Sequence, residues 1–300
     1  MIGGGGRMAS AGAIERMADA MAPRGPDGAG VVSRGRVGFG HRRLKIIDLS
    51  EAAAQPFVDT GLGMTIAFNG CIYNYPELRT ELEAAGHVFA STGDTEVILK
   101  AWAEWGPDCV SRFHGMFAFA IHDRASDRVW LVRDRFGIKP MYLAEADGRL
   151  RFASTLPALV ASGGIDTGID RVALHHYMTW HAVVPAPRTI LKGVRKLPPA
   201  TIREIAPDGT ATDRTYWEPR FDRSPEDAGR SAEEWRDMVL EAFRTAVRRR
   251  MVADVPVGVL LSGGVDSSMI VGLLAEEGQK DLATYSIGFE EAHGEKGDEF

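Results

Sequence analysis

The 300-residue sequence has few cysteines, no long apolar run and no excess of positive charge. Two cysteines, Cys71 and Cys109, are too few for a disulfide framework or a cysteine-rich metal site, which indicates a reducing compartment. No stretch of about 18 apolar residues predicts a membrane-spanning helix, and the first residues lack a signal-peptide core. A formal net charge of −6 argues against a nucleic-acid-binding surface. We therefore expect a cytoplasmic protein whose partners are neither nucleic acid nor membrane.

The composition is that of an ordinary folded chain, with 45% hydrophobic and 25% charged residues. Three hundred residues are more than one compact domain usually requires, so we expect two domains. The opening stretch "MIGGGG" is predicted to form neither helix nor strand, because its four glycines lose too much backbone entropy on folding.

The residues from 10 to about 200 are predicted to form a layered α+β domain. Apolar residues at helical spacing predict a short amphipathic helix over 10–22, and "PRGPDGAG" after it is typical of a loop. Helices that stop at a glycine are predicted over 75–86 and 94–106. Strands are predicted over 37–49, 64–74, 116–123, 128–134 and 149–155. Many strands with only two helices between them favour layers over a βαβ series.

The sequence pattern of the first domain ends near residue 190. Residues 191–217 are predicted to form a hairpin with an Asp-Gly turn, and a polar linker follows it. Ser231 and Glu234 form the capping box of a helix that runs to about residue 251. Next come a buried strand at 257–261, a glycine loop, a helix to 278 and the strand "LATYSIGF". One βαβ unit cannot cover both faces of a parallel sheet, so we expect this domain to continue beyond Phe300.

The loop "LLSGGVDSSM", residues 260–269, has the composition of a phosphate cradle. Glycines 263 and 264 let backbone N–H groups approach an anion, and the following helix adds the positive end of its dipole. Three serines (262, 267 and 268) supply hydroxyl donors, and Asp266 is placed to hold Mg²⁺. Because the loop contains no lysine, it differs from the P-loop of kinases.

Ser-Gly-Gly-x-Asp-Ser closely resembles the pyrophosphate-binding loop of the ATP pyrophosphatase superfamily, which splits ATP between the α- and β-phosphates. The front half resembles a class II glutamine amidotransferase, and the whole chain resembles the asparagine synthetase family. The matching stretches are "APRGPDGAG", "GHRRLKIIDLS", "FNGCIYNYPELR", "GDTEVILKAW", "RFHGMFAFAI", "RDRFGIKPMY" and "DVPVGVLLSGGVDSS". "MAPRGPDGAG" and "NGCIYN" suggest a narrower likeness to the N-acetylglutaminylglutamine amidotransferase branch.

The resemblance implies roles for individual residues. Arg43 would pair with the α-carboxylate of glutamine, Asp94 would bind its ammonium, and the Asn69 side chain with the Gly70 N–H would form the oxyanion hole. The glutamine-binding set is Arg43, Leu44, Ile46, Ile47, Asn69, Gly70, Cys71 and Asp94. The ATP-binding set is Leu261, Ser262, Gly263, Gly264, Asp266, Ser267, Ser268, Ile287 and Gly288, with Asp266 as the Mg²⁺ ligand.

Two positions depart from the family pattern. The family's nucleophile is a cysteine directly after the initiator methionine, where this chain has Ile2, and position 71 is Cys71 where a glutamate is common. The leader is also short and lacks an apolar first strand. The start site could lie upstream, with a Met-Cys-Gly-like start and an apolar strand; the glutaminase could be inactive, leaving an ammonia-dependent synthetase; or the protein could resemble β-lactam synthetase. We expect this polypeptide alone to release no ammonia from glutamine.

The resemblance implies an α+β N-terminal domain, a four-layer αββα sandwich of the Ntn-hydrolase type, over residues 1–205. A hairpin and linker over 206–230 would join it to a truncated α/β parallel-sheet domain, adenine nucleotide α-hydrolase-like, over 231–300. The expected activity is glutamine- and ATP-dependent amide synthesis on aspartate or a small peptide such as N-acetylglutaminylglutamine. An inactive fragment or a glutamine-binding remnant is the alternative outside enzymes. The substrates would be small molecules, and the oligomeric state stays open, a homodimer included.

Overall fold

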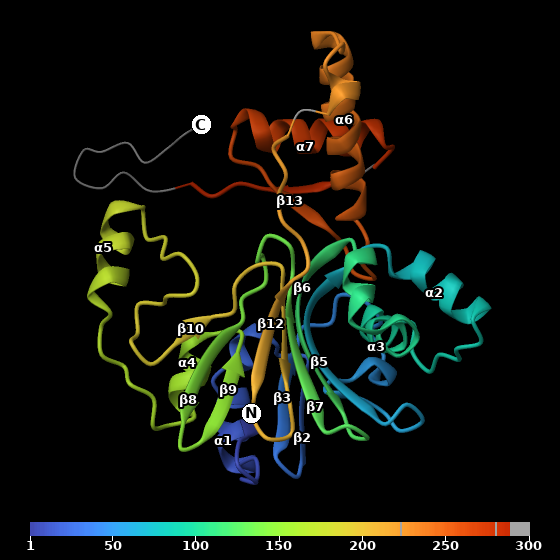
Figure 1. The fold of residues 1–300 in the computed structure, drawn as a ribbon. Coiled ribbons are helices and arrows are strands. Elements are labelled where there is room, and N and C mark those ends of the chain that lie inside the picture. Colours follow the sequence, from blue (N-terminus) through green and yellow to red (C-terminus); the bar gives the residue numbers. More distant parts are fainter. Residues whose placement is uncertain (223, 280, 289–300) are drawn as a thin grey trace. The chain divides into compact units, whose positions relative to one another are not determined.

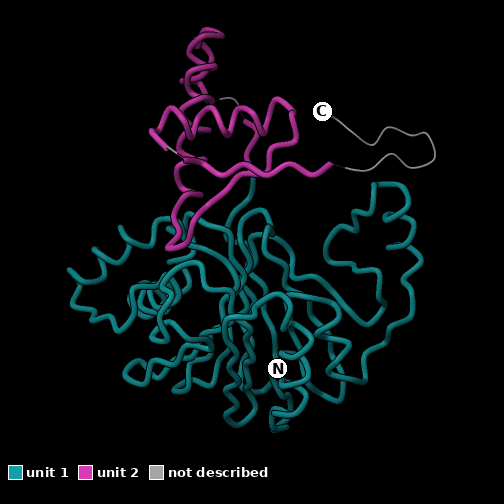
Figure 2. Tube along the Cα trace, turned by 180° about the vertical axis from the view of Figure 1, so that it is seen from behind, with its two compact units in different colours: residues 1–219 teal, residues 220–300 magenta. Residues whose placement is uncertain are grey.

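The computed structural model describes residues 1–222, 224–279 and 281–288. The chain forms two compact units, unit 1 over residues 1–219 and unit 2 over residues 220–300 (Figure 2). Within the described residues, no helix is long and apolar enough to cross a lipid bilayer.

Unit 1 is built around two six-stranded sheets whose paired strands are antiparallel (Figure 1). The first sheet has the order β10 (Arg195–Lys196), β8 (Tyr142–Ala146), β9 (Arg149–Ala153), β1 (Ile2–Gly3), β3 (Val37–Arg43) and β2 (Gly28–Arg34). The second has the order β12 (Ala211–Thr215), β11 (Thr201–Ile205), β7 (Arg128–Arg133), β6 (Gly115–Asp123), β5 (Met64–Ile72) and β4 (Phe57–Asp59).

Helices cover the outer faces of the two sheets. They are α1 (Ala11–Asp19), α2 (Tyr75–Ala84), α3 (Asp94–Trp105) and α4 (Leu156–Ala161). The further helix α5 (Arg171–Thr179) lies apart from the two sheets (Figure 1). Short 3-10 helices are η1 (Ala22–Arg24), η2 (Glu51–Ala53), η3 (Gly106–Arg112) and, in unit 2, η4 (Pro225–Asp227).

Three clusters of buried side chains fill the spaces between the layers of unit 1. Between the sheets, Phe39 of β3 packs with Ala120 of β6 and Leu131 of β7. On the outer face of the second sheet, Phe119 belongs to a cluster that includes buried residues of α2 and α3. On the outer face of the first sheet, Ile14 of α1 shares a cluster with buried residues of α4. Alternation along each strand therefore gives the order helix, sheet, sheet, helix that the family resemblance implies.

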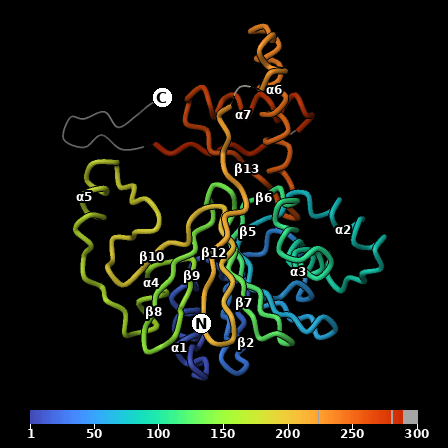
Figure 3. The backbone as a smooth tube through the Cα atoms, in the orientation of Figure 1, coloured from blue at the N-terminus to red at the C-terminus, as the bar shows by residue number. Residues whose placement is uncertain are grey.

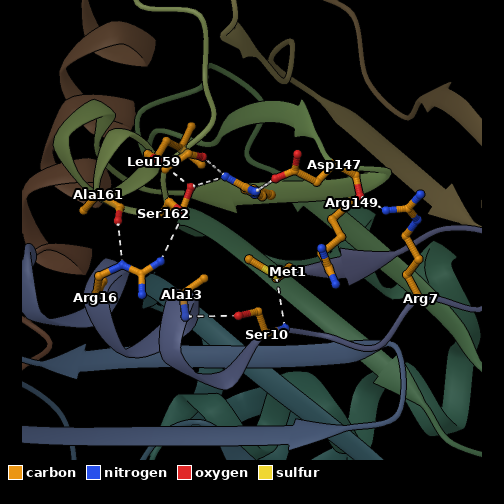
Figure 4. A network of polar contacts seen from close by, with 12 residues as sticks. Met1, Arg7, Ser10, Ala13, Arg16, Asp147, Arg149, Leu159, Ala161 and Ser162 are labelled. Carbon is orange, nitrogen blue, oxygen red and sulfur yellow. Dashed lines mark hydrogen bonds and ion pairs between the residues drawn. The ribbon is translucent and has the colours of Figure 1, made fainter.

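Helix α1 follows the predicted amphipathic pattern, with Ile14, Met17 and Ala18 buried. Its N-terminus is capped by the Ser10 hydroxyl, which accepts a hydrogen bond from the Ala13 N–H at 3.4 Å. Arg16 joins α1 to α4: its guanidinium donates to the carbonyl oxygens of residues 161 and 162 at 3.1 and 3.4 Å (Figure 4). These carbonyls lie at the end of α4, where helices leave acceptors unsatisfied.

The prediction that the first six residues form no element is wrong for Ile2 and Gly3. These residues form β1, and Ile2 pairs with Val37 on one side and Leu150 on the other. The Ile2 side chain is buried between the sheets, so pairing on both sides and apolar burial outweigh the backbone entropy of the neighbouring glycines.

Other predicted boundaries shift because edge positions carry weak patterns. The stretch expected as a loop after α1 contains the start of β2, an edge strand. The predicted strand over 37–49 ends at Arg43, after which the chain forms a loop. The expected domain boundary after residue 205 falls inside the hairpin β11–β12, and Figure 3 shows β12 beside the strands of unit 1, whose sheet it joins.

Unit 2 contains α6 (Ala232–Arg249), β13 (Gly258–Leu260), α7 (Val265–Glu276) and β14 (Ala283–Tyr285). The predicted capping box is confirmed, because the Ser231 hydroxyl accepts from the Glu234 N–H and the Glu234 carboxylate accepts from the Ser231 N–H. Strands β13 and β14 are parallel, as a βαβ unit requires. Phe289, the last residue of the predicted second strand, lies outside the described residues.

Gly25, in the "RGPDG" stretch, lies against the backbone of β3. A Cβ at this position would lie 2.4 Å from the carbonyl carbon of Arg42 and 2.7 Å from the amide nitrogen of Arg43. A larger residue must therefore push the chain away from the end of β3.

We predict that Gly25→Ala lowers the free energy of unfolding by about 1–3 kcal/mol, because overpacking against backbone is not relieved by a rotamer change. Gly12→Ala is the matched control: Gly12 lies in α1, and the nearest atom to its added Cβ is 3.8 Å away. That control should raise the free energy of unfolding by about 0.5–1 kcal/mol. Urea unfolding followed by circular dichroism measures both, and equal stability of the two variants would contradict the close packing.

Candidate functional site

On two strands in opposite sheets, the side chains that face the space between the sheets change from apolar to polar toward the end of the strand. On β3, Phe39 packs between the sheets and is followed on the same face by His41 and Arg43. On β5, Ala67 packs against the same core and is followed by Asn69 and Cys71. The period of two therefore places four functional candidates at one end of the space between the sheets.

A cavity of about 330 Å³ occupies this end of unit 1. Every residue of the expected glutamine-binding set lines it, namely Arg43, Leu44, Ile46, Ile47, Asn69, Gly70, Cys71 and Asp94. They come from the end of β3 and its following loop, the end of β5 and the first residue of α3. The structure thus brings together side chains that lie up to 51 positions apart in the sequence (94 − 43).

The Gly70 N–H points away from the neighbouring strand β6. Gly70 pairs with Phe117, but the N–H and C=O of Phe117 bond to Asp134 on the other side, at 3.1 and 2.8 Å. The pair is therefore of the non-hydrogen-bonded kind, and both residues direct their polar groups outward. A Cβ on Gly70 would lie 2.2 Å from the Met116 carbonyl oxygen, so only glycine fits this position.

Residues on either side of Gly70 confirm the direction of this strand edge. The Phe68 N–H donates to the side chain of Gln55 at 2.7 Å, and the Ile72 N–H donates to the Asp94 carboxylate at 3.0 Å. Residues 68, 70 and 72 point their N–H groups to the same side because successive residues of a strand alternate. The Gly70 N–H therefore lies between two occupied donors on an edge that borders the cavity.

Asp94 begins helix α3 and is only 6% exposed. Burial raises the pKa of its carboxyl to about 7, while hydrogen bonds from the Ile72 and Thr95 N–H groups, and the charge of Arg43, offset part of the rise. A buried carboxylate that takes up a proton near neutral pH is suited to pair with a cationic ligand.

Arg43 also holds the loop that follows β3, which the sequence did not predict. Its guanidinium donates to the carbonyl oxygens of Ser50 at 2.8 Å and Ile47 at 3.3 Å, and also to that of Asp48. Three of the five N–H groups of this side chain therefore hold the loop that follows β3. The loop in turn forms part of the cavity wall through Ile46 and Ile47.

Cys71 lines the cavity as a protonated thiol. Burial and the nearby charge of Asp94 together raise its pKa to about 12, although Lys139 opposes the shift. Cys109 is fully buried in the core, and burial raises its pKa far above the ordinary value. Neither cysteine therefore supplies a thiolate, the form in which cysteine acts as a nucleophile.

Sequence reasoning missed several polar residues that also line this cavity, among them His41, Gln55, Thr95 and Lys139. His41 could have been found, because it lies two positions before Arg43 and so on the same strand face. Gln55 and Lys139 lie in loops, where no periodicity indicates which side chains point inward.

In unit 2, the serine- and glycine-rich loop lies between the carboxyl end of β13 and the start of α7. Gly263 has a φ of +77°, and Gly264 precedes the helix without a side-chain cap, so the first N–H groups of α7 take no hydrogen bond from a capping side chain. The Ser267 hydroxyl lies 3.3 Å from the Ser262 amide nitrogen and 3.1 Å from the Gly264 carbonyl oxygen. This arrangement fits an anion at the helix N-terminus.

The remaining members of the expected ATP-binding set lie around this loop. Leu261 donates its N–H to the Tyr285 carbonyl at 2.8 Å, and its own carbonyl accepts from the Ser286 hydroxyl at 2.7 Å. Ile287 and Gly288 follow, so they lie beyond the carboxyl end of the parallel strand β14, and both are exposed. Asp266 and Ser268 lie in the first turn of α7 and are exposed. Ligands of parallel sheets bind at such carboxyl ends.

The donor set of this loop fits a phosphate-bound Mg²⁺ ion. Among the described residues, no three histidine, cysteine or acidic side chains form a cluster that could hold a metal ion. Mg²⁺ in nucleotide sites is commonly held by one or two carboxylates together with phosphate oxygens and water, and Asp266 offers one such carboxylate.

Comparison with known proteins gives matches over most of the chain. Residues 2–217 match the glutamine amidotransferase domain, and residues 238–300 match asparagine synthase. The glutamine-hydrolyzing asparagine synthetase 1 of Bacillus subtilis is 39% identical over 93% of this chain and 43% of its own length. The putative asparagine synthetase 2 of Methanocaldococcus jannaschii is 35% identical over 94% of this chain and 58% of its own length.

A solved structure shares the fold of the chain. The glutamine phosphoribosylpyrophosphate amidotransferase of Bacillus subtilis, complexed with ADP and GMP, covers 94% of this chain and 64% of its own, with a TM-score of 0.55 and 16% identity. At that identity the likeness shows the fold alone.

The chain spans 43% to 58% of the length of these asparagine synthetase relatives. Residues 2–217, more than two thirds of the chain, match one family model. The chain therefore belongs to the glutamine amidotransferase domain family, and its residues 238–300 match the asparagine synthase family.

Proposed function

We propose that unit 1 binds glutamine as the glutaminase part of an ATP-dependent amide-forming enzyme of the asparagine synthetase type. The observation that carries this proposal is the single cavity lined by all eight residues of the expected glutamine-binding set. The names of the relatives, which describe glutamine-hydrolyzing asparagine synthetases, support the same assignment.

Each polar part of glutamine has a partner in this cavity. The Asp94 carboxylate would accept the ligand's ammonium, and the two remaining N–H groups of Arg43 would hold its carboxylate. The Gly70 N–H, directed away from β6, and the Asn69 side-chain amide would donate to the oxygen of the ligand's amide group. That pair of donors is what an oxyanion hole requires.

The loop of unit 2 would bind the pyrophosphate part of ATP. Its serines, glycines and the start of α7 provide the donors, and Asp266 would hold the Mg²⁺ ion, which neutralises phosphate charge. In the complete enzyme, an oxygen of the acceptor carboxylate would attack the α-phosphorus and release pyrophosphate. Ammonia would then attack the activated carbonyl carbon, and AMP would leave. The acceptor would be aspartate or a small peptide such as N-acetylglutaminylglutamine.

The cysteines of this chain favour binding without hydrolysis as a second candidate function. Cys71 borders the oxyanion donors but stays protonated, and Cys109 is enclosed in the core. An ammonia-dependent enzyme or a β-lactam synthetase-like enzyme would have no use for a glutamine pocket, whereas Arg43, Asn69, Gly70 and Asp94 all line one here. Glutamine binding is therefore the property to measure first.

We predict that the 300-residue chain binds glutamine and that the affinity falls as the pH is lowered below 7. The folded-state pKa of Asp94 is raised to about 7, so below that pH a proton occupies the carboxyl and must leave before the ammonium of glutamine can pair with it. The dissociation constant should rise roughly tenfold for each pH unit below 7 and level off above it. Isothermal titration calorimetry between pH 5.5 and 8 measures this.

Asp94→Asn should weaken binding by about 10- to 100-fold, the worth of a hydrogen-bonded charge, and should remove the pH dependence. Asp108→Asn is the control, because the Asp108 side chain is 79% exposed. A dissociation constant that stays flat across this pH range would rule out Asp94 as the ammonium partner, and a wild-type chain that binds no glutamine would rule out the proposed function.

A second prediction concerns the full-length protein that contains this chain. Asp266→Ala should abolish formation of AMP and pyrophosphate, because the Mg²⁺ ligand of the phosphate loop is lost, while glutamine binding stays at the wild-type level. Asp281→Asn is the control, an exposed carboxylate at the turn before β14. Amide formation at the wild-type rate in Asp266→Ala, or release of ADP and phosphate by the wild type, would contradict the adenylation mechanism.

A further inference from the structure

The backbone of Phe68 is held by two side chains where a neighbouring strand would normally lie. Strand β4 pairs with β5 only as far as Phe57 and Ile66, and beyond that point no strand of the described residues lies beside this edge of β5. There the Phe68 N–H donates to the Gln55 side-chain oxygen at 2.7 Å, and the Phe68 carbonyl lies 3.0 Å from the Nε2 atom of His41.

These two contacts come from different parts of unit 1. His41 belongs to β3 in the first sheet, whereas Phe68 belongs to β5 in the second sheet, so the His41 contact joins the two sheets at the cavity. Gln55 lies just before β4, and its side-chain nitrogen donates onward to the Thr95 hydroxyl at 3.3 Å in α3. Phe68 is thereby connected to the strand that carries Arg43 and to the helix that begins with Asp94.

The protonation state of His41 follows from its partner. A carbonyl oxygen only accepts, so Nε2 carries the proton and Nδ1 does not. Burial, together with the charge of Arg43, lowers the pKa of His41 to about 4 although the bond to Phe68 opposes the shift, so the imidazole is neutral at physiological pH. Nδ1 is buried without a hydrogen-bond partner among the described residues, which leaves the contact with Phe68 as the one directed bond of the ring.

We propose that His41, supported by Gln55, is a positioning residue that fixes the peptide segment Phe68–Asn69–Gly70 and thereby aligns the oxyanion donors with Arg43. This inference rests on the proposed glutamine site. The carbonyl held by His41 belongs to the same peptide group as the Asn69 N–H, so tilting that peptide turns both Asn69 and the following Gly70 N–H. His41 contacts the backbone that carries the proposed ligand-binding groups, and it does not contact the reacting atoms. Alignment of this kind is what pre-organised donors require.

Amide hydrogen exchange of the 300-residue chain tests the positioning role without any enzymatic turnover. His41→Leu removes the Nε2 donor, whereas His41→Gln places an amide N–H near the same point. We expect the Asn69 amide to exchange at least tenfold faster in His41→Leu and at close to the wild-type rate in His41→Gln. The Leu131 amide, in β7, should exchange equally in all three proteins, which separates a local effect from general destabilisation.

Gln55→Glu gives a second variant if His41→Leu fails to fold. It keeps the acceptor for the Phe68 N–H and removes the donor to Thr95. Exchange at Asn69 should therefore stay within about threefold of the wild type in Gln55→Glu and rise at least tenfold in Gln55→Leu, which removes the acceptor. An unchanged Asn69 exchange rate in His41→Leu or, where that variant does not fold, in Gln55→Leu would overturn the positioning role.

Kinetics of the full-length protein then relate the positioning to catalysis. In His41→Leu the kcat of glutamine hydrolysis should fall about 10- to 100-fold, less than the loss of an oxyanion donor itself, with KM within about threefold. His41→Gln should restore kcat. A higher KM at unchanged kcat would assign His41 to ligand binding and contradict the inference. A wild-type protein that neither binds nor hydrolyses glutamine would contradict the proposed function. The exchange rates would still decide whether His41 fixes the Asn69 peptide.

Discussion

The proposed glutamine site depends on an edge of β5 that no other strand of the described residues covers. Beyond Ile66, alternate residues of β5 direct their polar groups away from β6, and the side chains of Gln55, His41 and Asp94 bond to the N–H and C=O of Phe68 and to the N–H of Ile72. The Gly70 N–H is the donor that this arrangement leaves for a ligand. A backbone donor held by a sheet needs no reorganisation when charge develops near it, which is why rigid strands make good supports for catalytic hydrogen bonds.

The two charged side chains of the expected glutamine-binding set, Arg43 and Asp94, are buried and have lost most of their contact with water. Asp94 is buried at a helix start, where its carboxyl would hold a proton near neutral pH, and a cationic ligand would restore its charge. Arg43 donates to three carbonyl oxygens of the loop that forms the cavity wall, and in the proposed site its other donors would hold the ligand. The same side chain thus shapes the cavity and completes its electrostatics, so a change at residue 43 would alter both.

Strong local patterns predict much of this structure from the sequence. Alternation finds β5, β6 and β7, and the serine–glutamate pair finds the start of α6, because each depends on neighbours within four residues. Strand β1 was missed because its pairing comes from residues 35 and 148 positions away (37 − 2 and 150 − 2). The grouping of the glutamine set follows from resemblance, but the loop contacts of Arg43 and the His41–Phe68 bond depend on tertiary geometry that no local pattern contains.

The central claim is that glutamine lies in this cavity with its amide group at the free edge of β5. A crystal structure of the chain with glutamine tests it directly. We predict that the amide oxygen of the ligand lies within about 3.1 Å of the Gly70 nitrogen and the Asn69 side-chain nitrogen, with the ammonium against Asp94. Glutamine bound with its amide group turned away from Gly70, or bound outside the cavity, would contradict the account.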